Sequence, residues 1–335
     1  MKAATILLLL CLPLLVAAQG GRNVSELNIS IAIFDPGIPA DRSLHRDLQV
    51  FPRVREIEAL YLPFVLREAL VGTQEWGAVR VVPESDIAAE LLVSGTIVRS
   101  DGETLQLQMR AVDASGRVWV DRVFAGVTAN QQLYDDIATG LRTARAELDS
   151  KTLQNVIEIS LLRYAQQLAP DAFAGYLSST SDGTFRIERL PAANDPMVER
   201  IERIRGVEYV FTDAVDAKFR ELSADVAIVY DVWREYRRKF TQYQIDDALH
   251  AQNSKSDAPR GSYEAILSRY ENYKWDRQAA QEQESWAVGF ENEVGPTITA
   301  IEARVAELEG WVEDRYAEWR RILTELFELE TELPD

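Results

Sequence analysis

The sequence predicts an α+β protein: a mixed or antiparallel sheet packed with helices, followed by a long helical hairpin resembling a coiled coil. Between residues 25 and 148, short runs rich in β-branched residues alternate with stretches of helical periodicity. Between 211 and 335, apolar residues recur in steps of three and four, which is typical of packed helices. We expect the intervening segment, 149–210, to contain one helix and an irregular connector.

Residues 1–18 have the layout of a secretory signal peptide. A positive start precedes an apolar run that ends in small residues, so we expect cleavage after Ala18. The alternative, a membrane anchor, is disfavoured because the run is short and no basic residues follow to stop transfer. The single cysteine, Cys11, lies inside this run without the preceding small residue of a lipoprotein signal. We therefore predict a periplasmic protein with no membrane-spanning segment after cleavage and no disulfide or thiolate chemistry.

The first domain, 25–148, is predicted from alternation and turn signals. In its middle strand Leu105, Leu107, Met109 and Ala111 alternate with polar residues, so one face should be buried and the other solvated. Glycine-containing turns of hairpin length connect the last three strands. In order, we expect strands at 27–34, 78–82, 91–99, 104–112 and 118–125, and helices at 53–71 and 130–148.

The segment 89–126, AELLVSGTIVRSDGETLQLQMRAVDASGRVWVDRVFAG, resembles the meander of the TolB amino-terminal and CsgG-like envelope domains. Gly95, Asp113 and Gly116 occupy the positions of the glycine and the Asp-x-x-Gly turn in that pattern. The resemblance implies a non-enzymatic envelope module that docks onto other proteins or assembles into rings. The chain departs from those families because it has no lipoprotein signal and no propeller-type repeats.

The connecting segment opens with a predicted helix at 152–168 and then becomes irregular from 170 to 196. It contains a local concentration of basic residues: Arg186, Arg189, Arg200, Arg203 and Arg205. One interpretation is a site for an anion or an acidic partner. We favour the other, in which these arginines pair with the excess carboxylates of the chain itself.

A helical hairpin or a three-helix unit is expected in the last region. Its helices run from about 212 to 250 and from about 262 onward, and Gly295-Pro296 should break or kink the second. The second helix begins with an apolar face made of Tyr263, Ile266, Tyr270 and Tyr273. The hairpin seam is rich in aromatic residues, which are typical of a core but also favoured at protein interfaces. The candidate interaction residues are Trp233, Tyr236, Phe240, Trp311, Tyr316 and Trp319.

The charge of the chain excludes some classes of partner. With 36 Lys+Arg against 54 Asp+Glu, the net charge is −18, so we expect no nucleic-acid partner. From 261 to 335, 7 basic residues stand against 18 acidic ones, a net charge of −11 that should keep the arm solvated.

The sequence contains no recognisable catalytic constellation. Its two histidines, His45 and His250, lie near aspartates, but neither group has the second histidine that would favour a metal. We expect no catalytic residues, no metal and no cofactor. The leading hypothesis is an exported, acidic, non-enzymatic envelope protein that acts through protein–protein interaction or self-association. The alternatives are a periplasmic protein that binds a small ligand and an uncharacterised hydrolase.

Overall fold

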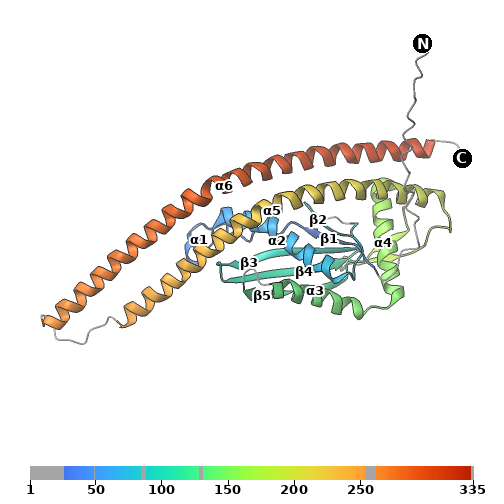
Figure 1. Cartoon of the computed structure of the whole chain (residues 1–335). Helices are drawn as coiled ribbons and strands as arrows, with labels where there is room; N and C mark the ends of the chain where they lie inside the picture. Colours follow the sequence, from blue (N-terminus) through green and yellow to red (C-terminus); the bar gives the residue numbers. More distant parts are fainter. Residues whose placement is uncertain (1–25, 49, 84–87, 128–130, 254–261, 333–335) are drawn as a thin grey trace, which may run out of the picture.

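The computed structural model describes residues 26–48, 50–83, 88–127, 131–253 and 262–332, and it confirms the predicted α+β class (Figure 1). The predicted signal peptide and Cys11 lie outside the described residues. The elements in chain order are β1 (Ile29–Ala32), α1 (Ser43–Asp47), α2 (Pro52–Thr73), β2 (Val79–Val82), β3 (Leu91–Ser100), β4 (Thr104–Asp113), β5 (Val118–Val127), α3 (Gln131–Ala146), α4 (Ser150–Leu168), β6 (Leu177–Ser179), β7 (Phe185–Ile187), α5 (Pro196–Asn253) and α6 (Tyr263–Glu332).

Five strands form one mixed sheet in the order β2-β1-β3-β4-β5. β1 runs parallel to both β2 and β3, whereas β3, β4 and β5 form an antiparallel meander. Each predicted strand, and each of the three predicted helices up to Leu168, forms within two residues of its expected bounds. These elements were predictable because turns and alternation are local signals.

One face of this sheet carries the hydrophobic core. Alternate residues of β3 and β4 are buried, as the alternation in the sequence predicted, and α2 and α3 pack against them. The intervening residues of these strands are partly or fully exposed. The sheet therefore has a packed face and a face that meets solvent.

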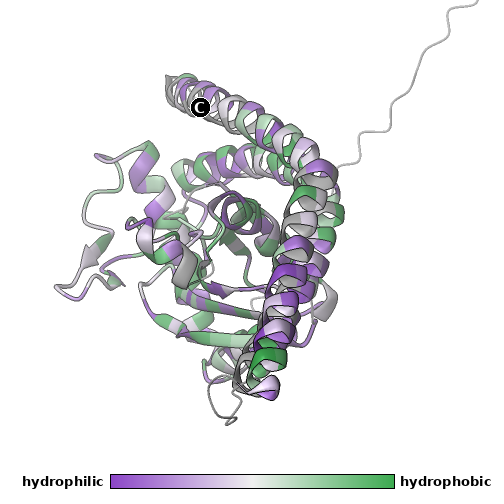
Figure 2. Ribbon diagram, turned by 90° about the vertical axis from the view of Figure 1, so that its left-hand side faces the viewer, coloured by the Kyte–Doolittle hydropathy of each residue, from purple (hydrophilic) through white to green (hydrophobic). Residues whose placement is uncertain are grey.

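Helix α5 is joined to the first domain through a line of stacked aromatic rings. Phe219 of α5 stacks on Phe64 of α2 at 6.1 Å between ring centroids, and Tyr230 lies 5.3 Å from Tyr61. Tyr230 also stacks on Trp233, at 5.6 Å. Figure 2 shows both long helices lying along one side of the domain. These rings belong to the same core as the sheet, so the base of the hairpin is part of the α+β domain.

The predicted single seam of α5 is therefore divided between two partners. Phe219 and Trp233 pack in the core of the first domain, whereas Leu222 and Val226 pack with Ile298 and Ile301 of α6 and with Ile57 of α2. A helix that buries residues towards two neighbours needs a wider apolar surface than a coiled-coil stripe.

The turn between β3 and β4 also lies close to α5. Gly102 has a positive φ of 92°, and a Cβ atom there would lie only 2.3 Å from the Cβ of Arg237 in α5. Only glycine meets both conditions without strain. The turn therefore abuts α5 at this point.

The expected start of the first long helix, near 212, was wrong. α5 begins at Pro196, where the Asp195 side chain accepts a hydrogen bond of 2.9 Å from the Met197 amide. Proline is favoured in the first helical turn, because its missing N–H has no partner there, so Pro196 starts a helix that the prediction placed later. The irregular connector also contains a small hairpin, β6–β7.

Of the two outcomes expected at Gly295-Pro296, a break or a kink, the break is wrong, because α6 is one helix from Tyr263 to Glu332 and the hairpin has no third helix in the described residues. Ile298 and Ile301, one turn further on, are buried against α5. Thr299 Oγ1 donates a hydrogen bond of 3.1 Å to the Gly295 carbonyl oxygen. The packing that follows the proline stabilises the helix across the lost backbone hydrogen bond.

The apolar face predicted at the start of α6 is exposed to solvent. Ala265 is buried there instead, while Tyr263, Ile266, Tyr270 and Tyr273 are all more than half exposed. The sequence pattern identified an apolar face correctly but did not show which face α5 covers.

A buried ionisable cluster lies beneath the aromatic contact. Glu58 of α2 is fully buried, accepts a hydrogen bond from Ser100 Oγ and lies 3.8 Å from Arg55. The hydroxyl of Tyr230 faces the same carboxyl group, and Asp101 and Tyr134 also act on it electrostatically. Burial raises the pKa of Glu58 to about 7, although Ser100 and Arg55 oppose the rise.

We predict that Trp233→Ala lowers the free energy of unfolding by about 3–5 kcal/mol, because the lost indole leaves a cavity in the core. The matched control is Ile228→Ala in the same helix, where the side chain is 70% exposed. The control should change the stability by less than about 0.5 kcal/mol. Urea titrations followed by circular dichroism measure both values. Equal effects of the two substitutions would contradict the burial of α5 against the domain.

A second prediction concerns pH. The folded-state pKa of Glu58 lies above its ordinary value of 4.5, so the folded protein binds more protons than the unfolded chain between pH 4.5 and 7. The stability contributed by this group is therefore present at pH 4.5 and is lost as the pH rises to 7, by up to about 3 kcal/mol. Glu58→Gln should remove this loss, whereas Glu56→Gln, at an exposed glutamate of the same helix, should retain it. Urea titrations at pH 4.5, 6 and 7 test this; an unchanged pH dependence in Glu58→Gln would refute it.

Candidate docking groove

The candidate aromatic residues do not form one site. Trp233 is 3% exposed and packs within the main core, so it acts as a structural contact. Trp319 of α6 is half-buried and lies 5.1 Å from Phe211 of α5. The ring of Tyr236 lies against α6 at Gly289. The side chains of Phe240, Trp311 and Tyr316 lie outside the described part of the structure.

The basic residues of the connecting segment do not behave uniformly either. Arg205 is buried and donates hydrogen bonds to the Ala88 carbonyl oxygen and to Ser160 Oγ, at 2.9 and 2.7 Å. Arg189 lies over the ring of Tyr176, at 4.0 Å from its centroid. The observed partners of these two arginines are a backbone carbonyl group, a serine hydroxyl group and a tyrosine ring. The sequence analysis had favoured carboxylates as their partners.

The two edges of the sheet differ. At the β2 edge, the buried carboxylate of Asp216 in α5 accepts a hydrogen bond of 3.0 Å from the Val81 amide. Arg80 of the same strand forms an ion pair of 2.6 Å with Asp213. Helix α5 therefore covers this edge and satisfies part of its backbone.

The opposite edge is formed by β5. Among the described residues, β5 pairs only with β4, and Val118, Val123 and Val127 are 45–63% exposed. The register shifts between Ala111 and Val112 of β4, opposite Trp119, which indicates a β-bulge at the start of the edge. An exposed strand of ten residues is a template for pairing with another chain.

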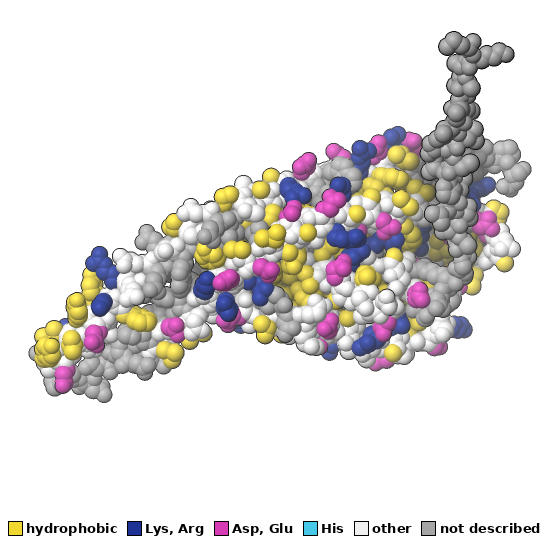
Figure 3. Space-filling model, in the orientation of Figure 1, with side chains coloured by type: hydrophobic (Ala, Val, Ile, Leu, Met, Phe, Trp, Pro, Cys, Tyr) yellow, Lys and Arg dark blue, Asp and Glu magenta, His cyan; other side chains and the backbone are white. Residues whose placement is uncertain are grey.

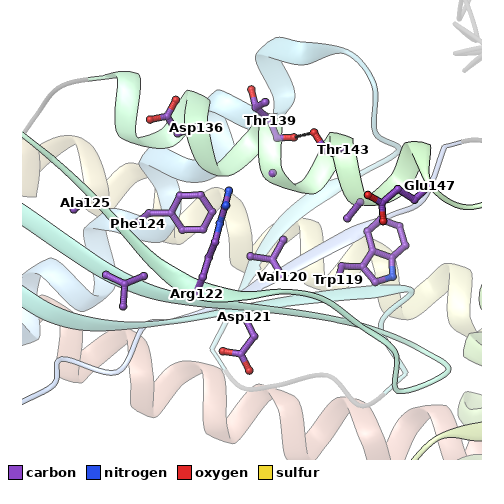
Figure 4. A pocket seen from close by; sticks show the side chains of 13 residues that line it. Trp119, Val120, Asp121, Arg122, Phe124, Ala125, Asp136, Thr139, Thr143 and Glu147 are labelled. Carbon is purple, nitrogen blue, oxygen red and sulfur yellow. Dashed lines mark hydrogen bonds between the residues drawn. The ribbon is translucent and has the colours of Figure 1, made fainter.

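A groove of about 710 Å³ lies between β5 and α3 (Figure 4). Helix α3 turns Leu133, Ile137 and Leu141 towards the core, and the side of the helix next to this stripe forms one wall of the groove. The wall from β5 includes Trp119, Arg122 and Phe124.

Inside the groove, the guanidinium group of Arg122 lies over the Phe124 ring, at 4.4 Å from its centroid. Figure 4 shows both side chains rising from β5 towards α3. A Cβ atom at Gly140 of α3 would lie 3.3 Å from Arg122 Nη2 and 3.4 Å from Phe124 Cζ. Glycine at this position therefore lets the stacked pair approach the helix.

The polar groups of the groove are suited to binding. Asp136, Thr139 and Thr143 of α3, and Glu147 directly after this helix, line it together with Arg122 of β5. The Asp136 carboxylate accepts a hydrogen bond of 2.8 Å from Gln132, and Thr143 Oγ1 donates one of 2.8 Å to the Thr139 carbonyl oxygen. These groups offer carboxylates, hydroxyl groups and one cation along an apolar floor.

The possible histidine sites have other contacts. His45 donates a ring N–H hydrogen bond of 2.7 Å to the Pro39 carbonyl oxygen, and Asp41 accepts hydrogen bonds from Ser43. The side chain of His250 is outside the described part, while Asp246 accepts a hydrogen bond from Gln242. In the described ranges, no three His, Cys, Asp or Glu side chains are grouped as metal ligands would be. None of the helices in those ranges combines the length and apolar character needed to cross a bilayer.

The sequence analysis missed the groove because strand order is not a local property. The sequence analysis did not single out the valines of β5, which were the available signal. That β5 is an edge, and that α3 returns beside it, follows only from the fold.

Comparisons with known proteins do not identify a family. No family model and no curated protein matches the chain. Among solved structures, the PelC dodecamer of Paraburkholderia phytofirmans aligns with 36% of this chain and 90% of its own, at 13% identity and a TM-score of 0.22. A similarity at this level carries no argument about fold or function.

Proposed function

We propose that this protein is an exported, non-enzymatic docking module of the cell envelope. In this proposal, β5 and the groove beside it bind an extended segment of a partner protein, and the α5–α6 hairpin acts as a spacer. The layout of residues 1–18 supports export to the periplasm, and the resemblance to TolB amino-terminal and CsgG-like domains supports an envelope role.

The observation that carries the proposal is the difference between the two sheet edges. Asp216 closes the β2 edge, whereas β5 leaves a ten-residue edge beside a groove. Binding by strand addition uses such an edge for main-chain hydrogen bonds and neighbouring pockets for side chains. The charged pair Asp121 and Arg122 in the middle of β5 would restrict pairing to matching partners.

The chemistry of the groove favours a partner segment with apolar and basic side chains. Asp136 and Glu147 place two carboxylates on the α3 wall, and the single cation, Arg122, is already stacked on Phe124. In an added strand, alternate side chains would point into the groove. A basic side chain there would meet the carboxylates of α3, while apolar ones would contact Val120 and Phe124.

The volume of the groove also supports a second candidate function, binding of a small periplasmic ligand. About 710 Å³ lies within the range of small-molecule sites, roughly 300–1,000 Å³. We favour the extended segment because the groove runs along a free strand edge. Thermal-shift measurements distinguish the two candidates: stabilisation by a small molecule that is abolished by Thr143→Lys would favour the ligand.

We predict that a photo-crosslinking amino acid in place of Val123 captures a discrete partner in the periplasmic fraction of cells. The control position is Val98 of β3, an equally exposed valine of the same sheet that is remote from the groove. Mass spectrometry of the crosslinked product should identify the captured protein. The crosslink should lie in an extended segment of that protein that contains basic residues. The mature chain in this fraction should begin at Gln19.

A groove substitution provides the matching test of the wall formed by α3. Thr143→Lys places a cation beside Arg122 and should lower the yield of the Val123 crosslink by at least about tenfold, corresponding to 1.4 kcal/mol. Equal yields at Val123 and Val98, or a yield that Thr143→Lys leaves unchanged, would contradict docking at β5.

A further inference from the structure

The far end of the hairpin carries an apolar surface with no neighbour among the described residues. Tyr263, Ile266, Leu267, Tyr270 and Tyr273 follow the helical spacing of one face of α6, and their exposed fractions lie between 41 and 78%. We call these five residues the tip face. Figure 3 shows hydrophobic side chains gathered at this end of the molecule.

The exposed apolar residues at the end of α5 form a separate surface. Ile245 and Leu249 are 46% and 50% exposed, but the helical spacing places them on the side of α5 opposite Tyr236, which contacts α6. Side chains of this size expose on the order of 100 Å² each, so two copies of the five-residue tip face would together bury roughly 1,000 Å², the size of a weak protein interface. Exposed patches of this size on soluble proteins mark interaction sites.

The local charge at the tip differs from that of the rest of α6. From residue 263 to 278, three basic residues balance three acidic ones, whereas from 279 to 332 four basic residues stand against fourteen acidic ones. Two copies of a chain with a net charge of −18 repel each other over most of their surface. The neutral start of α6 permits close approach of two copies there.

The shape of the molecule supports the same conclusion. The hairpin extends beyond the α+β domain, so two tips can meet without contact between the domains (Figure 1). A lipid surface fits less well, because binding to anionic headgroups needs an excess of positive charge that the tip face lacks. Glu264 and Glu271 also lie on α6 at the level of the exposed tyrosines.

We propose that the tip face binds the tip face of a second copy of this chain, which joins two hairpins into a dimer. This inference deepens the role given to the hairpin in the proposed function, but it does not depend on the groove at β5. Packing the exposed tyrosines and aliphatic side chains of two copies together would remove them from water.

The test uses the chain from Gln19 to Asp335, which contains every described element and lacks Cys11. Light scattering coupled to size-exclusion chromatography, from about 1 to 100 µM, should show a concentration-dependent dimer. The double substitution Ile266→Ser and Tyr270→Ser should raise the dissociation constant at least tenfold. The matched control, Ile228→Ser, changes an exposed isoleucine of the same hairpin and should have no effect.

A covalent measurement locates the contact. In this cysteine-free chain, Tyr270→Cys should form a disulfide-linked dimer under mild oxidation, whereas Ile228→Cys should stay monomeric. A monomer at all concentrations, or a dimer that the double substitution leaves intact, would overturn the proposal. Binding of the monomer to phosphatidylglycerol vesicles, lost in the double variant, would replace the second copy with a lipid surface. Whatever the outcome, crosslinking at Val123 tests docking at the groove separately, so failure of the dimer can be distinguished from failure of the proposed function.

Discussion

The packing of α5 against α2 is the contact on which the rest of this structure depends. The pairs Phe64–Phe219 and Tyr61–Tyr230 join a helix of the hairpin to a helix of the sheet domain. Because the contact lies inside the main core, the base of the hairpin has a fixed direction relative to the sheet. The same helix brings Asp216 to the β2 edge, so one interaction both orients the hairpin and closes one side of the sheet.

This arrangement separates the surfaces of the molecule. Among the described residues, the β5 edge has no neighbouring strand and lies away from α5. Tyr263, at the start of α6, lies about 50 Å along the helix from Ile298, which packs with α2 and α5. The proposed binding edge and the proposed dimer surface are separate, so both could be occupied at the same time. The buried Glu58 lies beneath the contact between these parts, which links the stability of that contact to pH.

Local patterns predicted most of the elements but not their neighbours. The alternation of Leu105, Leu107 and Met109 predicted both the strand and its buried face. At Pro196 the analysis overlooked a local signal, because Asp195 caps the helix that begins at the proline. At Pro296 the continuity of the helix depends on the packing of Ile298, which is a tertiary fact. The aromatic residues of the hairpin were recognised, but whether a ring such as Trp233 is buried depends on α2, far away in sequence. The groove could not be predicted because it requires the order of the strands.

The most direct test of the fixed direction of the hairpin is the distance between one spin label on the sheet domain and one on the outer part of the hairpin. Pulsed electron paramagnetic resonance measures this distance. Labels at Val98→Cys in β3 and Ile245→Cys in α5 occupy exposed positions of the sheet domain and the outer hairpin. If α5 is built into the core, the distance distribution has a single narrow maximum. A broad distribution, as for two bodies joined by a flexible linker, would contradict the account.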